Sequence, residues 1–180
     1  MSVHLILGGA RSGKSSHAEC LAKQAAQKQS ATLHYVATAT ALDDEMRARI
    51  AHHQARRNAE WIEHEVPVAL ADYLARFQKN DVVLVDCLTL WLNNLLFEHE
   101  QSLSSSLIDE YIEQLLAALA QTQAQVILVS NEVGMGVVPM GELTRFFVDH
   151  AGWMNQKIAA LADSVTLVVA GLPQCLKGES

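Results

Sequence analysis

The chain has 180 residues, half of them apolar, which fits one domain with a sizeable buried core and leaves little room for two. Its formal net charge of −7 argues against general binding to nucleic acids or anionic membranes, because such binding needs a basic surface. Cys20, Cys87 and Cys175 lack the spacing of a metal site and favour buried or tolerated thiols in a reducing cytoplasm. The apolar run near the start is too short for a signal peptide or a membrane span.

Short runs rich in β-branched residues alternate with helical patterns along the chain. Strands are predicted over residues 3–8, 33–38, 82–86, 126–130 and 165–171. Helices are predicted over residues 14–28, 43–58, 68–78, 88–98, 107–121 and 141–162, lengths that suit right-handed crossovers between parallel strands. Residues 98–106 are predicted to form an exposed loop, in which Ser105 or Ser106 caps the next helix. The pattern predicts an α/β fold: one domain over residues 1–180, with a mostly parallel central sheet and helices on both faces.

The first predicted strand runs directly into "GGARSGKS", which satisfies the phosphate-binding pattern G-x-x-x-x-G-K-[ST]. The glycines let the loop curl, so that backbone N–H groups and the amino end of the next helix point at phosphates. Lys14 would reach the β and γ phosphates, and Ser15 would offer its hydroxyl to Mg²⁺. The sequence therefore predicts a P-loop that contacts a nucleotide through Gly8, Gly9, Ala10, Arg11, Ser12, Gly13, Lys14 and Ser15.

A carboxylate at the end of a second apolar strand extends this site. P-loop proteins usually take an acidic residue from such a strand end, and "VVLVD" places Asp86 there. Lys14, Ser15 and Asp86 together indicate a nucleoside triphosphate bound with Mg²⁺, and they leave hydrolysis, phosphorylation and switching open. The guanine motif [NT]-K-x-D of a GTPase switch is absent, since "SNEVGMG" supplies Asn131 and Glu132 but no lysine.

Two adjacent histidines, His52 and His53, lie in the charged stretch "DDEMRARIAHHQARRN". Successive helical positions are about 100° apart, so only one of the two can point directly at a nucleotide on the P-loop. The stretch by itself favours a solvated helix face.

The chain resembles the bifunctional adenosylcobinamide kinase / adenosylcobinamide-phosphate guanylyltransferases of cobalamin biosynthesis. The resemblance covers nearly the whole chain through "LGGARSGKS", "YVATATALDDEMRARIAHH", Trp61, Glu65, "LVDCLTLWLNNLL", "VSNEVGMGVVP" and "RFFVDHAGWMNQKIAALAD". It implies a P-loop fold that transfers a phosphoryl group from ATP or GTP to the aminopropanol hydroxyl of adenosylcobinamide. GMP from GTP is then transferred to adenosylcobinamide phosphate through a guanylylated histidine. The resemblance also implies a homo-oligomer, with a trimer suggested.

The same resemblance assigns individual residues. His53 becomes the nucleophile, because it follows a variable, often basic position that His52 occupies here. A neutral imidazole can attack the α phosphate of GTP and release pyrophosphate. Arg56 and Arg57 either hold triphosphate oxygens or face the solvent. The other nucleotide contacts that the resemblance implies are Val36, Ala37 and Thr38 at the end of the second strand, Gln54 and Ala55 beside His53, and Glu65 near the guanosine.

Two further groups of residues are apolar or glycine-rich. One group falls at helical spacing and is expected in the core or in a subunit contact: Trp91, Leu92, Leu95 and Leu96. Met135 and Gly136 are expected to shape a loop near the corrinoid substrate.

Two other functions stay open at this stage. One is a single-activity P-loop small-molecule kinase in which His53 has no role, and the other is a nucleotide-responsive regulatory domain. They differ in what GTP does, because only the bifunctional enzyme would become covalently labelled by it. The preferred phosphoryl donor, the range of corrinoids and the number of nucleotide sites are open as well.

Overall fold

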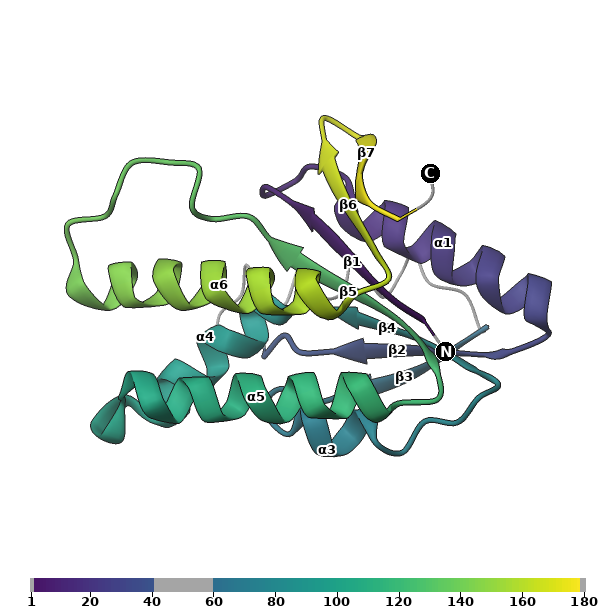
Figure 1. The fold of residues 1–180 in the computed structure, drawn as a ribbon, viewed down its shortest axis with the longest axis horizontal. Coiled ribbons are helices and arrows are strands. Elements are labelled where there is room, and N and C mark those ends of the chain that lie inside the picture. Colours follow the sequence, from purple (N-terminus) through teal and green to yellow (C-terminus); the bar gives the residue numbers. More distant parts are fainter. Residues whose placement is uncertain (1, 41–59, 179–180) are drawn as a thin grey trace.

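The computed structural model describes residues 2–40 and 60–178, which build one seven-stranded sheet in the order β3-β2-β4-β5-β1-β6-β7 (Figure 1). The strands are β1 (Ser2–Gly8), β2 (Thr32–Ala37), β3 (Trp61–Glu65), β4 (Asp81–Asp86), β5 (Gln125–Asn131), β6 (Ser164–Val169) and β7 (Leu172–Lys177). The helices are α1 (Lys14–Gln29), α3 (Leu70–Leu74), α4 (Leu88–Glu98), α5 (Ser105–Gln121) and α6 (Glu142–Leu161), with a 3-10 turn at Glu100–Ser102. All pairings are parallel except that of β6 with β7. The predicted α/β class is confirmed.

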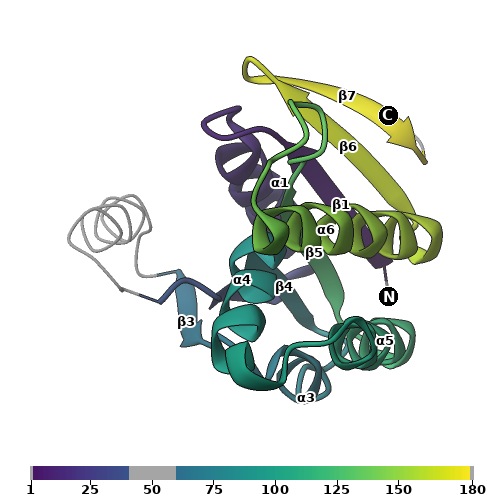
Figure 2. The same ribbon diagram turned by 90° about the vertical axis from the view of Figure 1, so that its left-hand side faces the viewer.

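Helices lie on both faces of the sheet, as the sequence predicts. Figure 2 shows α1 on one side and α3, α4, α5 and α6 on the other. The central strands between these layers are mostly apolar on both faces, and residues Val82 to Val85 of β4 are fully buried. Burying such β-branched runs on both sides is the main favourable contribution to folding.

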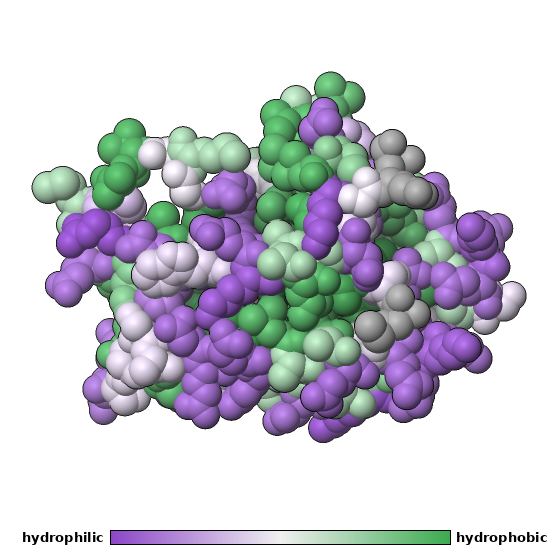
Figure 3. Space-filling view, viewed as in Figure 1, coloured by the Kyte–Doolittle hydropathy of each residue, from purple (hydrophilic) through white to green (hydrophobic). Residues whose placement is uncertain are grey.

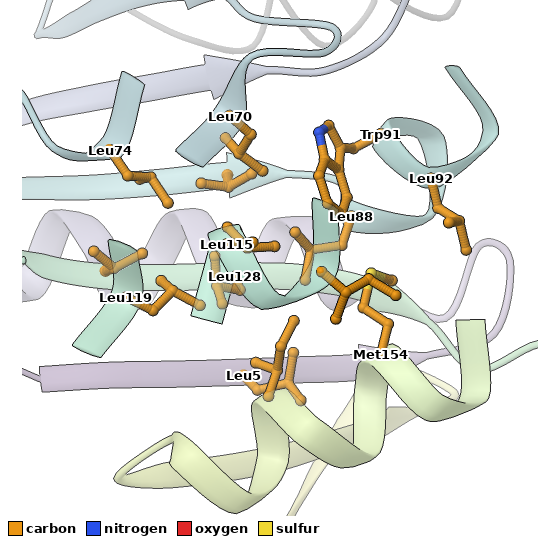
Figure 4. Close-up of a cluster of buried hydrophobic side chains, with 14 of the residues drawn as sticks. Leu5, Leu70, Leu74, Leu88, Trp91, Leu92, Leu115, Leu119, Leu128 and Met154 are labelled. Carbon is orange, nitrogen blue, oxygen red and sulfur yellow. The ribbon is translucent and has the colours of Figure 1, made fainter. Parts of the chain in front are cut away.

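The larger apolar layer lies under α4, α5 and α6 (Figure 4). Trp91 is 1% exposed, and its indole N–H donates to the Val68 carbonyl at 2.7 Å, so the ring is buried without an unsatisfied donor. Leu92, Leu95 and Leu96 are buried in the same layer. Trp91, Leu92, Leu95 and Leu96 were expected in the core or in a subunit contact, and their position in the core is confirmed.

Several element boundaries differ from the prediction. The helix predicted over residues 68–78 is only α3, Leu70–Leu74. Farther along, the Asp81 carboxylate accepts a hydrogen bond from the Gln78 backbone N–H at 2.7 Å and fixes a turn before β4. Ser104, not Ser105 or Ser106, caps α5, with its hydroxyl accepting from the Leu107 N–H at 3.3 Å. The predicted helix over residues 43–58 lies outside the described residues.

The two edge strands were not predicted. In β3 the sequence "WIEHE" is mostly polar, and only Trp61 is buried. The strand predicted over residues 165–171 ends at Val169, because Ala170 (φ 51°) and Gly171 (φ 79°) reverse the chain into antiparallel β7. Edge strands tolerate polar residues because one edge and often one face stay in water, so the apolar pattern used for buried strands misses them.

A chain of hydrogen bonds links α3 to β4 across β3 and β2. Tyr73 Oη lies 2.8 Å from His64 Nδ1, His64 Nε2 lies 2.9 Å from His34 Nδ1, and His34 Nε2 lies 3.3 Å from Asp81 Oδ1. With both imidazoles neutral, one set of tautomers satisfies all three contacts, since the tyrosine and each histidine donate to the next group along the chain. A proton added to His64 Nδ1 would remove the acceptor of Tyr73.

We expect this arrangement to make folding stability fall in acid. Burial, and then the neighbouring His34, lower the pKa of His64 below 6.5, so the unfolded chain takes up the proton more readily than the folded one. The stabilisation is present above the unfolded pKa of 6.5 and is lost as the pH falls through the lower folded value. Thermal midpoints measured from about pH 7.5 to 5.5 should therefore drop less for His64→Gln than for the wild type. Equal drops would show that His64 does not contribute to acid sensitivity.

Candidate active site

The turn between β1 and α1 has the geometry of a phosphate-binding loop. A Cβ at Gly8 would lie 2.5 Å from Ser12 Oγ and 2.6 Å from the Val168 carbonyl oxygen, so only glycine fits there. Gly13 has a φ of 95°, which side chains rarely adopt, and it precedes α1, whose amino end no side chain caps. The first turn of the helix therefore presents its N–H groups and positive dipole end for an anion.

The phosphate-binding loop is fixed by one hydrogen bond within the loop and by another from the hairpin of β6 and β7. Lys14 is 6% exposed, and its ammonium donates to the Gly9 carbonyl across the loop at 3.1 Å. The Gly171 N–H, from the turn between β6 and β7, donates to the Ser12 carbonyl at 2.8 Å. These contacts fix the loop before any nucleotide binds, which reduces the entropic cost of binding.

Asp86 ends β4 at the same edge of the sheet. The Tyr35 hydroxyl, from β2, donates to Asp86 Oδ2 at 3.0 Å and orients the carboxylate. Burial and the Asp86 charge raise the pKa of the Cys87 thiol to about 11, against a smaller lowering by the Lys14 charge. The Cys87 thiol is therefore neutral near pH 7, and Lys14 and Asp86 act electrostatically on the same group from two different elements.

Strand register brings three of the predicted residues into one row. Ala37 at the end of β2 pairs with Glu65 on β3 and with Asp86 on β4. Glu65 is exposed, and Ala37 is partly so. In an open α/β sheet the carboxyl ends of the strands face the ligand, so this row continues the P-loop edge across the sheet.

Val36 and Thr38 flank Ala37 and are fully buried. Val36 belongs to the core, while the Thr38 hydroxyl donates to the Cys87 carbonyl at 2.7 Å and accepts from the Cys87 N–H at 2.9 Å. This pair of hydrogen bonds joins the end of β2 to the end of β4, next to Asp86. The side chains of Val36 and Thr38 are thus occupied by contacts within the protein. A nucleotide could contact this segment only at Ala37 or at backbone atoms.

The sequence is similar to known proteins over almost its whole length. Residues 4–176 match the family described as cobinamide kinase / cobinamide phosphate guanyltransferase. The bifunctional adenosylcobalamin biosynthesis protein CobP of Pseudomonas aeruginosa is 51% identical over 176 residues, covering 97% of each chain. CobU of Salmonella typhimurium, with the same description, is 43% identical over 178 residues, covering 93% of this chain and 96% of its own.

The chain belongs to the cobinamide kinase / cobinamide phosphate guanyltransferase family. It is accordingly an enzyme with kinase and guanylyltransferase activities of adenosylcobalamin biosynthesis, as the sequence resemblance implies, and nucleotides are its substrates.

Solved structures agree on the fold alone. The flagellar accessory protein FlaH of Methanocaldococcus jannaschii superposes with a TM-score of 0.53 at 16% identity, covering 99% of this chain and 79% of FlaH. A second solved structure, an ATPase domain, gives a TM-score of 0.51 at 12% identity, covering 92% of this chain and 68% of that domain. Both are consistent with the predicted P-loop NTPase-like architecture.

Asn131 also lies at this edge of the sheet, although in the sequence it stands out only within a segment that lacks the lysine of a guanine motif. Asn131 ends β5, the strand between β4 and β1, and pairs with Gly8 of the P-loop. Its backbone N–H donates to Thr89 Oγ1 at 2.7 Å, and its carbonyl accepts from Asn155 Nδ2 at 3.1 Å. Its position between Gly8 and Asp86 makes Asn131 a candidate site residue for this family member. Only the order of the strands places it there, so no short sequence motif could have identified it.

His52, His53, Gln54, Ala55, Arg56 and Arg57 lie outside the described residues, so their roles rest on the sequence. Among the described residues, no cluster of three or more histidine, cysteine or acidic side chains could hold a metal ion. No helix within the described ranges is long and apolar enough to span a bilayer.

Proposed function

We propose that one nucleotide site at the P-loop serves phosphoryl transfer from ATP or GTP to the hydroxyl of adenosylcobinamide. The observation that supports this most is the loop itself: Gly8 tolerates no side chain, Gly13 has a positive φ, and the uncapped amino end of α1 follows. Residues Gly8 to Ser15 would surround the phosphates with backbone N–H groups. Lys14 would neutralise charge that develops on the transferred phosphoryl group.

Magnesium fits this site as a bound partner of the nucleotide. Ser15 on the first turn of α1 and Asp86 at the end of β4 offer hard oxygen donors, which Mg²⁺ prefers, and both act at the same edge of the sheet. When bound, Mg²⁺ supplies positive charge to the phosphate oxygens. Tyr35 would keep the Asp86 carboxylate oriented for this role through its 3.0 Å hydrogen bond.

Asp86→Asn is expected to weaken Mg²⁺-dependent nucleotide binding by about tenfold or more, because a charged ligand is lost. Titration calorimetry with ATP and with GTP, in the presence and absence of Mg²⁺, measures the effect. Asp109→Asn on α5 is the matched control and should bind as the wild type does. If nucleotide binding by the Asp86→Asn variant depends on Mg²⁺ as strongly as binding by the wild type does, Asp86 is not a metal ligand and its role is structural.

For the second reaction we propose His53 as the nucleophile. An imidazole nitrogen would form a P–N bond to the α phosphorus of GTP as the bond to the bridging oxygen breaks and pyrophosphate leaves. An oxygen of adenosylcobinamide phosphate would then displace the histidine, giving adenosylcobinamide-GDP and free His53. Arg56, Arg57, Gln54, Ala55 and Glu65 would hold the nucleotide during these steps.

Labelling with GTP tests the covalent step. Incubation with GTP carrying a label on its α phosphate should leave acid-labile, alkali-stable label on the protein, as a phosphoramidate does. ATP labelled on its γ phosphate serves as the control, because it should transfer label to adenosylcobinamide and leave none on the protein. An active kinase that takes no label from GTP would support the single-activity alternative instead.

We also propose how the protein assembles and which class of partner it binds. The family resemblance supports a cytoplasmic homo-oligomer, for which a trimer is proposed, and sedimentation velocity would measure the subunit number. The acidic net charge of −7 supports small-molecule substrates over nucleic acids.

A further inference from the structure

Exposed apolar side chains gather on one segment of the molecule. Within the described ranges, six of the eleven large apolar side chains that are exposed lie on the loop of residues 132–141, called here the β5–α6 loop, or on α6. They are Met135, Val137, Val138, Met140, Leu143 and Trp153, between 48% and 96% exposed. Figure 3 shows apolar atoms at the tip that this loop forms. Such concentration is unusual for a surface without a binding partner.

The β5–α6 loop is held in this exposed position by polar contacts at both ends. At its start, the Glu132 N–H donates to the Gly8 carbonyl at 3.1 Å, and the Gly134 N–H donates to Glu132 Oε1 at 2.9 Å. At its end, the Arg145 guanidinium donates to the carbonyls of Pro139 and Met140. The apolar side chains therefore face outward on a backbone that is already fixed.

A groove of about 380 Å³ separates the β5–α6 loop from α6. Trp153 forms part of its wall and is supported from behind, since its ring packs edge-on against His150 at 5.0 Å and His150 stacks on Phe146 at 3.9 Å. Arg145 and Asp149 also line the groove, which thus combines apolar walls with a hydrogen-bond donor and an acceptor. This combination is typical of a small-molecule site.

The β5–α6 loop begins at the P-loop. Asn131 pairs with Gly8 in the sheet, and the hydrogen bond from Glu132 ends on the Gly8 carbonyl, so the loop leaves the sheet directly beside the phosphate-binding turn. A kinase must hold its acceptor next to the nucleotide, because the reacting atoms need to approach within about 3–3.5 Å. The loop that carries the apolar side chains therefore starts beside the place where the acceptor hydroxyl has to arrive.

We infer that the β5–α6 loop and its groove bind the corrin ring of cobinamide. This inference rests on the proposed kinase function, which supplies the substrate. The corrin ring is large, flat and edged with methyl groups and amide side chains, so it needs apolar area together with donors and acceptors. The groove takes one edge of the ring, whose amides meet Arg145 and Asp149, while the face of the ring covers Val137, Val138 and Met140. The aminopropanol arm then extends toward Gly8.

The test compares polar substitutions on the loop with one at a remote exposed position. In the kinase assay, the double variant Val137→Ser/Val138→Ser and the single variant Met140→Ser should raise the KM for cobinamide, about tenfold for the double variant, because buried apolar contacts are lost. The KM for the nucleotide and the rate at saturating cobinamide should stay near the wild-type values. Leu176→Ser is the control, since Leu176 is exposed on β7 near the end of that strand remote from the P-loop and should behave as the wild type.

Failure of the inference and failure of the proposed function give different results. If the wild-type protein does not phosphorylate cobinamide, the proposed function is wrong. If it does, and the loop variants keep the wild-type KM for cobinamide, the inference is overturned. A lower sedimentation coefficient of the loop variants would also overturn it, because the apolar surface would then be covered by a second copy of the chain.

Discussion

Replacing Lys14 with alanine is expected to lower the kinase rate about a thousandfold or more, because an ammonium group interacts strongly with developing phosphate charge where little water screens it. The side chain is only 6% exposed at the phosphate-binding loop. The substitution also removes the hydrogen bond to the Gly9 carbonyl, so the loop loses an internal contact. Initial rates of phosphoryl transfer to adenosylcobinamide, at saturating nucleotide, measure the effect.

Lys28→Ala is the matched control for this prediction, because Lys28 is an exposed lysine on the last turn of the same helix. It should keep the wild-type rate. Thermal unfolding of both variants separates loss of chemistry from loss of the fold. A Lys14→Ala protein that is folded and retains more than about a tenth of the wild-type rate would contradict the proposed role of Lys14.

The second large effect is expected from the adjacent histidines. His53→Ala should abolish covalent labelling by GTP and formation of adenosylcobinamide-GDP, while keeping much of the kinase activity. Phosphoryl transfer to the cobinamide hydroxyl depends on the P-loop, the bound nucleotide and substrate positioning, none of which uses the imidazole. His52→Ala is the matched control and should still take label. Label on His52, or on no histidine of residues 43–58, would refute the assignment.

The pH dependence of labelling supplies an independent check on the same residue. A histidine nucleophile has to be neutral, so labelling should fall as the pH drops below about 6.5, the ordinary pKa of the side chain. The positive charges of Arg56 and Arg57 would move this fall to lower pH if they lie close to His53 in the nucleotide complex. A labelling rate that does not change between about pH 8 and 5 would point to a different nucleophile.

Features that depend on neighbouring residues could be predicted from the sequence. The P-loop followed from "GGARSGKS" because its glycines and its position between strand and helix act within a few residues. Four of the five predicted strands agree with the structure to within a residue or so, since strands buried on both faces must be continuously apolar. The family resemblance was equally accessible, because it rests on the order of such local blocks along the chain.

Which distant residues share the site depends on the order and register of the strands. The row of Glu65, Ala37 and Asp86 depends on β2 lying between β3 and β4, and Asn131 reaches the site only because β5 lies between β4 and β1. Tyr35 is a core residue by its pattern, yet its hydroxyl orients Asp86. Strand order and register result from packing the whole apolar core at once, so no short window of the sequence contains them. The start of the β5–α6 loop depends on the fold in the same way, because the hydrogen bond from the Glu132 N–H to the Gly8 carbonyl forms only after β1 and β5 have paired. The contacts of Arg145 with Pro139 and Met140, in contrast, join residues that are near one another in the sequence.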